Sequence, residues 1–135
     1  MLIVNKYLMN SKIIFTLIVI SVVLMGFFSN KTQVPSIDQR LVGSWYAESD
    51  RNTKLVFSLK EGLVKKYWSE ELRWSYNYSV SHACNDNYDE KFYFMKWETD
   101  HGEELCFEIN GVNENNSGIL SLTSMQNGKV YLYKR

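Results

Sequence analysis

Apolar and polar residues alternate strictly in the segment LRWSYNYSV, residues 72–80. Leu, Trp, Tyr, Tyr and Val occupy every second position, and polar residues lie between them. In a β-strand this period of two puts all the apolar side chains on one face, whereas a helix would scatter them around its circumference. The segment therefore predicts a strand with one buried face.

Apolar runs separated by turn residues predict eight strands in all. The connections between them are too short for crossover helices, so we expect each strand to be antiparallel to its neighbour. Asn127-Gly128, in the last connection, favours a two-residue type I′ turn. The predicted strands are Val42–Glu48, Lys54–Leu59, Leu63–Trp68, Leu72–Ser81, Lys91–Glu98, Glu104–Ile109, Gly118–Ser124 and Lys129–Lys134.

Eight antiparallel strands in a flat sheet would leave two exposed edges, and closure into a barrel removes both. We therefore expect an all-β domain folded as an eight-stranded antiparallel up-and-down barrel, with a two-sheet sandwich as the alternative. A short helical turn over residues 36–41 is expected before the first strand. With one inward face per strand, the interior is expected to hold large side chains from Leu55, Phe57, Leu59, Leu72, Trp74, Tyr76, Tyr78, Val80, Phe92, Phe94, Leu105, Phe107, Leu120, Leu122, Val130 and Leu132.

Residues 1–29 differ from the rest of the chain. Lys6 and Lys12 precede sixteen uncharged residues, 13–28, as in the basic and apolar regions of an export signal. The end of this run offers poor cleavage positions, so we expect an uncleaved signal anchor, a transmembrane helix, with a removed signal peptide as the alternative. The polar residues 30–36 are expected to form a linker. Because positively charged flanks stay cytoplasmic, residues 37–135 are expected to form an exported domain.

Charge argues against nucleic acid as a partner. Basic and acidic residues balance at fifteen each, but three of the lysines precede residue 36, so the exported domain is acidic by about three charges. No basic stripe remains for a phosphate backbone.

The stretch LVGSWYAES carries a Gly-x-Trp motif at the start of the first predicted strand. With the helical turn before it, the meander of eight strands and the basic ending GKVYLYKR, residues 37–135 resemble the lipocalin-like domain. The most similar form is the short one found in exported bacterial proteins.

The resemblance implies roles for the motif. Gly43 would let the helical turn approach the barrel floor, where a Cβ would collide, and Trp45 would close one end of the barrel. A basic side chain from the last strand would lie across that tryptophan, and Lys134 and Arg135 are the candidates. These residues are structural in this interpretation.

Cys84 and Cys106 are the only cysteines, and in an exported domain an even pair favours a disulfide over two free thiols. No metal site is expected, because His82 and His101 match no familiar zinc spacing with these cysteines. Adjacent carboxylates such as Glu103-Glu104 would point to opposite faces of a strand, so no catalytic pair is predicted. We expect neither a cofactor nor an enzymatic activity.

We expect a monomer of the bacterial cell envelope. It is either anchored with its domain outside the cytoplasm or secreted to the periplasm. Two functions remain open for it. One is binding of a small apolar or amphipathic molecule in the barrel mouth. The other is a membrane-tethered module that docks to or inhibits another envelope protein. A cavity of several hundred Å³ would favour the first function, and a filled interior the second. The candidate ligand-binding residues are Trp74, Tyr76, Tyr78, Phe92 and Phe94.

Overall fold

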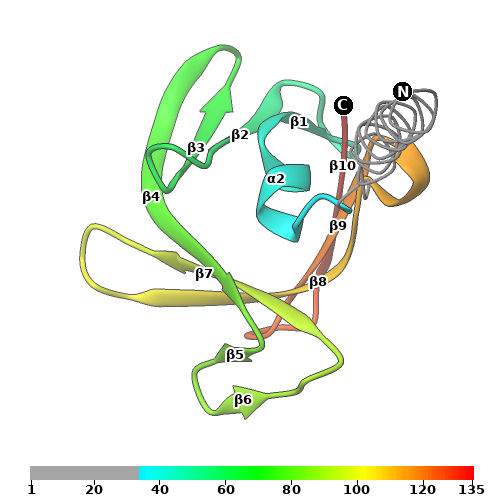
Figure 1. Cartoon of the computed structure of the whole chain (residues 1–135). Coiled ribbons are helices and arrows are strands. Elements are labelled where there is room, and N and C mark those ends of the chain that lie inside the picture. Colours follow the sequence, from blue (N-terminus) through cyan, green and yellow to red (C-terminus); the bar gives the residue numbers. More distant parts are fainter. Residues whose placement is uncertain (1–33) are drawn as a thin grey trace, which may run out of the picture. The chain divides into compact units, whose positions relative to one another are not determined.

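The computed structural model describes residues 34–135 (Figure 1). The expected anchor and most of the linker fall on residues 1–33, outside the described residues. Within residues 34–135, no helix is long and apolar enough to span a bilayer. The elements in chain order are α2 (Ile37–Leu41), β1 (Gly43–Ala47), β2 (Thr53–Ser58), β3 (Leu63–Trp68), β4 (Glu71–Ser81), β5 (Ala83–Cys84), β6 (Asn87–Tyr88), β7 (Tyr93–Glu98), β8 (Glu104–Val112), the 3-10 turn η1 (Glu114–Asn116), β9 (Ile119–Ser124) and β10 (Val130–Lys134).

Eight strands close into a barrel in the order β1-β10-β9-β8-β7-β4-β3-β2, and every neighbouring pair is antiparallel. The predicted barrel is confirmed, and the sandwich alternative is excluded. The seam between β1 and β10 is short, because only Tyr46↔Lys134 and Ala47↔Tyr133 are paired there.

The long connection between β4 and β7 was expected to be a turn but contains the small hairpin β5–β6. The predicted disulfide is confirmed, and it joins Cys84 of β5 to Cys106 of β8. Both cysteines and Phe94 are buried in a cluster separate from the main core. The hairpin is therefore fastened to the outer surface of the barrel wall.

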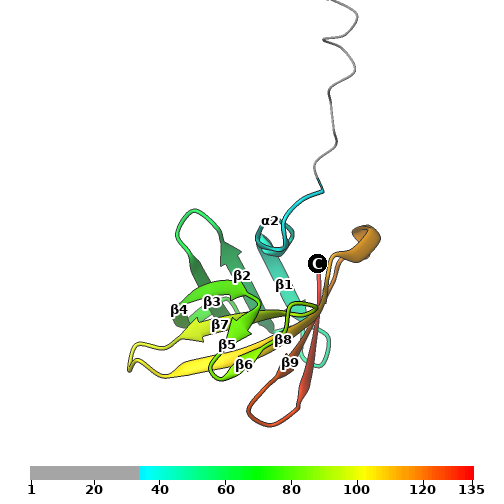
Figure 2. The same ribbon diagram turned by 60° about the horizontal axis from the view of Figure 1, so that its bottom comes forward.

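One end of the barrel is closed by α2 (Figures 1 and 2). Ser36 begins the helix with a capping box, in which its side chain accepts from Gln39 N and the Gln39 side chain accepts from Ser36 N. Leu41, the last residue of the helix, and Trp45 beneath it are fully buried, and the Trp45 indole donates to the Leu41 carbonyl at 2.6 Å. Trp45 therefore lies at the end of the barrel that α2 covers.

Arg135 completes this closed end. Its guanidinium carbon lies 4.3 Å from the centre of the Trp45 ring, and Nη2 donates to the carbonyls of Arg40 and Val42 at 2.8 and 2.6 Å. Of the two basic candidates, the structure thus selects Arg135. Lys134 instead pairs with Glu48.

The expected reason for Gly43 was wrong. A Cβ there would lie 3.7 Å from its nearest neighbour, Arg135 Nη2, which is an ordinary contact and not a collision. Gly43 has a φ of +117°, a conformation that side-chain-bearing residues rarely adopt. Glycine is required by the backbone as it leaves α2, not by lack of space.

The inward face was mispredicted in β7 and β10. In β7 the core residues are Met95 and Trp97, whereas Phe92 is 45% exposed and Phe94 belongs to the outer disulfide cluster. In β10 the inward residues are Tyr131 and Tyr133, whereas Val130 and Leu132 are exposed. A wrong starting phase moves every side chain of a strand to the other face.

Two further residues of the predicted interior are exposed for local reasons. Leu59 follows the end of β2 and is 48% exposed. Leu72 is 54% exposed because the register shifts at Lys66/Tyr67, so that Tyr67 pairs with Leu72 while Lys66 pairs with Trp74. Such a bulge breaks the alternation on which the prediction depended.

The β9–β10 connection also differs from the prediction. Gly128 N donates to the Ser124 carbonyl at 2.8 Å, and Ser124 N donates to the Lys129 carbonyl at 2.9 Å. In this loop only Gly128 has a positive φ, so the loop is longer than the expected two-residue type I′ turn.

Candidate ligand site at the open end of the barrel

The two ends of the barrel are built differently. α2 lies at one end with the β2–β3 and β8–β9 connections. The β1–β2, β3–β4, β7–β8 and β9–β10 connections lie at the other, and no helix of the described residues covers it. We call this second end the open end.

A cavity of about 130 Å³ lies inside the barrel toward the open end, and we call it the mouth cavity. It is smaller than the roughly 300–1,000 Å³ typical of sites for whole small molecules. The interior is therefore largely filled by side chains. The mouth cavity is lined by Leu55, Lys66, Trp74, Trp97, Phe107, Leu122, Tyr131 and Tyr133.

Aromatic rings form a continuous band along one side of this cavity. Trp74 lies 5.2 Å from Trp97, Trp97 lies 4.3 Å from Phe107, and Phe107 lies 6.3 Å from Tyr131, all between ring centres. The Trp97 indole donates to the Met95 sulfur at 2.8 Å, so its polar group is already satisfied. The band offers ring faces and edges to an apolar guest.

The polar groups of the mouth cavity are Lys66 and two tyrosines. Burial, with a smaller contribution from neighbouring Tyr131, raises the pKa of Tyr133 to about 12. Its hydroxyl therefore stays protonated at any physiological pH. Lys66 is the only basic residue in the lining.

The five candidate ligand residues lie in three different places. Trp74 lines the mouth cavity, and Tyr76 stacks on Trp74 with ring centres 4.3 Å apart without lining it. Tyr78 lies deeper, edge-on to Phe57 at 5.2 Å. Phe92 and Phe94 are outside the barrel interior, as described above.

Tyr78 does not line the mouth cavity. Burial is the main cause of its raised pKa, with a contribution from Asp38 of α2, and its backbone N donates at 3.0 Å to the carbonyl of Gly62 in the β2–β3 connection at the closed end. Its Oη is buried without a hydrogen-bond partner among the described residues.

The alternation pattern missed four lining residues: Lys66, Trp97, Tyr131 and Tyr133. The inward position of Lys66 could have been predicted, because Val64 two positions earlier is apolar and lies on the same face of the strand, which is buried at Val64. The inward position of Trp97 could also have been predicted, because the face expected to be inward in β7 continues to Lys96. The inward position of the two tyrosines could have been predicted from Arg135, as the Discussion explains.

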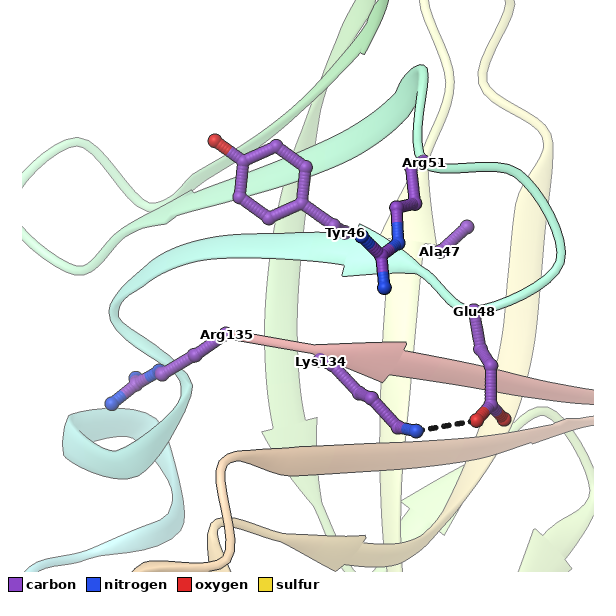
Figure 3. Close-up of a pocket in the computed structure, with 6 residues that line it drawn as sticks. All are labelled: Tyr46, Ala47, Glu48, Arg51, Lys134 and Arg135. Atoms are coloured by element: carbon purple, nitrogen blue, oxygen red, sulfur yellow. Dashed lines mark ion pairs between the residues drawn. The ribbon is translucent and has the colours of Figure 1, made fainter.

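A larger hollow of about 600 Å³, the seam groove, lies where β1 meets β10 (Figure 3). Its basic side chains are mostly engaged. Lys134 is paired with Glu48, and the Arg135 guanidinium lies toward α2. Arg51 and Arg135 form no ion pair within residues 34–135, but Arg135 donates to the carbonyls of Arg40 and Val42. The seam groove is lined by Tyr46, Ala47, Glu48, Arg51, Lys134 and Arg135.

Residues 34–135 contain no group of three or more His, Cys, Asp or Glu side chains placed to hold a metal ion. His82 Nδ1 lies 2.8 Å from the Phe92 carbonyl, and both cysteines are in the disulfide. Comparisons of the chain with family models, with curated proteins and with solved structures find no significant match. The described geometry therefore carries the functional argument by itself.

Proposed function

We propose that this protein is a non-enzymatic, lipocalin-like binding protein that holds the apolar part of a small molecule in the mouth cavity. The observation that carries the proposal is the aromatic band of Trp74, Trp97, Phe107 and Tyr131 around an internal hollow. Aromatic walls with a few polar groups are typical of sites for small ligands.

The size of the hollow limits what the ligand can insert. An apolar protein cavity of about 150 Å³ accommodates benzene. A cavity of about 130 Å³ therefore suits one ring or a short acyl group, and the rest of the ligand would lie outside. A hollow of about 380 Å³, whose lining shares Tyr131 and Tyr133, offers room beside it.

The lipocalin-like assignment has its own support. The Gly-x-Trp motif, the helix that closes the barrel and Arg135 over Trp45 agree with what the resemblance implies. In this proposal residues 1–29 act as the export signal that their charge and hydropathy pattern predicts, so the domain lies outside the cytoplasm, tethered to the membrane or released from it.

Native mass spectrometry of the full-length chain, purified from its own host, tests the proposal. We expect co-purified small-molecule mass on a monomer. NMR titration with 2-phenylethanol should shift resonances of the mouth cavity residues and leave Leu41 and Trp45 at the closed end unchanged. Absence of bound mass together with absence of these shifts would contradict the proposal.

A second candidate is the protein-docking module, which the small interior volume and one outer surface favour. Tyr46, Lys134 and Ile119 form a row across β1, β10 and β9, and Leu132 and Val130 continue on the same outward face. The four apolar members of this set are at least 40% exposed. A protein in place of a small molecule in the same mass spectrum, lost in a Leu132→Lys variant, would favour this function.

A further inference from the structure

Two consecutive lysines in β3 have opposite surroundings. Lys65 points outward and pairs with Glu61, with Nζ and Oε2 3.0 Å apart. Lys66 lines the mouth cavity. Lys65 forms an ordinary surface ion pair, whereas the inward position of Lys66 requires a separate explanation.

The register confirms that Lys66 points inward. Its partner on β2 is Leu55, which is 1% exposed, and its partner on β4 is Trp74. Directly opposed residues of neighbouring strands share a face. Val64, two positions earlier on that face, is fully buried.

No carboxylate within residues 34–135 forms an ion pair with Lys66. Three acidic residues near the open end are paired with other basic side chains: Glu70 with Lys54 at 2.6 Å, Glu71 with Arg73 at 3.1 Å and Glu104 with Lys96 at 2.8 Å. Lys66 is half-buried, so its ammonium group gives up part of its hydration on the inner face, at a free-energy cost that an apolar residue there would not have. An anion in the cavity would offset this cost.

We propose that Lys66 selects a carboxylate ligand, whose ring or short acyl group enters the mouth cavity while its carboxylate meets the Lys66 ammonium. This inference rests on the proposed function and names the ligand class of the same site. A charge-assisted hydrogen bond is stronger than a neutral one and also fixes the orientation of the ligand. Lys66 is therefore the specificity-determining residue of the cavity.

The test compares phenylacetate with 2-phenylethanol, which match in ring and chain but differ in charge. Calorimetric titration of the full-length chain should show about tenfold tighter binding of phenylacetate, as expected for one charged hydrogen bond. Lys66→Met should abolish this preference, so that the variant binds the two probes with about equal affinity. Lys66→Arg should keep it.

Lys65→Met is the matched control, because it removes the same charge from the neighbouring position on the outer face. It should retain the preference for phenylacetate. If Lys66→Met fails to fold, Lys66→Gln serves in the same comparison.

Equal affinity of the unmodified chain for the two probes would overturn the role of Lys66 and leave the proposed function intact. So would a preference that survives in Lys66→Met. Failure of both probes to bind, with no small molecule retained from the host, would overturn the proposed function as well.

Discussion

At the scale of single residues, Gly43 belongs to a motif that the sequence shows, but the physical reason for a glycine at this position cannot be read from the sequence. The motif predicted its place beside Trp45, and the structure confirms that place. The conformational reason, a φ of +117°, depends on how the backbone turns from α2 into β1. That angle is set by how α2 and β1 meet in the folded barrel, and the neighbouring residues in the sequence do not reveal it.

Gly43→Ala should therefore destabilise the domain by about 1–3 kcal/mol through backbone strain. Gly111→Ala is the control, because Gly111 lies outside the left-handed region and its Cβ would make an ordinary 3.6 Å contact with Glu114. The control should change the free energy of unfolding by less than about 0.5 kcal/mol. Urea denaturation of both variants checks this, and equal effects would contradict the strain argument.

Tyr133 is expected to make stability depend on alkaline pH. In the unfolded chain its pKa is near 10.0, and burial raises it to about 12 in the fold. Between these values the unfolded state holds fewer protons, so the free energy of unfolding falls as the pH rises, by up to about 1.4 kcal/mol per unit. Below pH 10 this contribution is fully present.

Denaturation at pH 9, 10 and 11 should show this fall, and Tyr133→Phe should make it shallower. Tyr88→Phe, at a side chain that is 66% exposed, is the control and should leave the slope unchanged. Identical slopes for the Tyr133→Phe variant and the unmodified chain would show that another group controls alkaline unfolding.

At the scale of elements, alternation predicted where strands lie better than which way they face. In β10 both faces are apolar, with Val130 and Leu132 on one and Tyr131 and Tyr133 on the other. Periodicity cannot choose between them. The position of Arg135 can, because in an extended strand residues 131, 133 and 135 share a face, and Arg135 covers the inward Trp45.

The outer hairpin β5–β6 could not be predicted from pattern, because each of its strands has only two residues. The disulfide, in contrast, could be predicted from the sequence, since the export that we expect for this domain would favour oxidation of a cysteine pair. The mouth cavity was only partly predictable. Trp74 followed from the clearest strand, whereas Lys66 and Trp97 required the correct phase in β3 and β7.

Removing the disulfide should loosen the hairpin and leave the barrel closed. The bond closes a loop across 22 positions, which is worth about 3 kcal/mol of stability. A Cys84→Ala/Cys106→Ala variant should lose amide protection in residues 82–92, because the hairpin lies outside the barrel wall. Hydrogen exchange measures this, with β2 and β3 as the internal reference. Loss of protection in β2 and β3 at the same rate would contradict the independence of the two parts.

At the scale of the barrel as a whole, side chains fill most of the interior, and α2 closes one end. Leu41 of α2 and Trp45 beneath the helix are fully buried, and Arg40 of α2 donates to Glu114 at 2.6 Å and to the Val112 carbonyl at 3.2 Å. A ligand that enters from the open end therefore meets packed side chains after a short distance. Insertion depth, not the polarity of the walls alone, should limit which ligands bind.

Depth-limited insertion predicts how affinity changes along the series of straight-chain alcohols, which carry no charge and so do not depend on Lys66. Each methylene that is buried should add about 0.8 kcal/mol of binding free energy. Once the cavity of about 130 Å³ is full, further methylenes remain in water and affinity should level off. Trp97→Ala, which enlarges the cavity at its wall, should move the plateau to longer chains, whereas Trp68→Ala, at a residue that does not line the cavity, should not move it. Calorimetric titration from butanol to dodecanol gives the curve. Affinity that keeps rising to dodecanol in the unmodified chain would mean that the side chains filling the interior move aside, and a lipid-sized ligand would then fit inside the barrel.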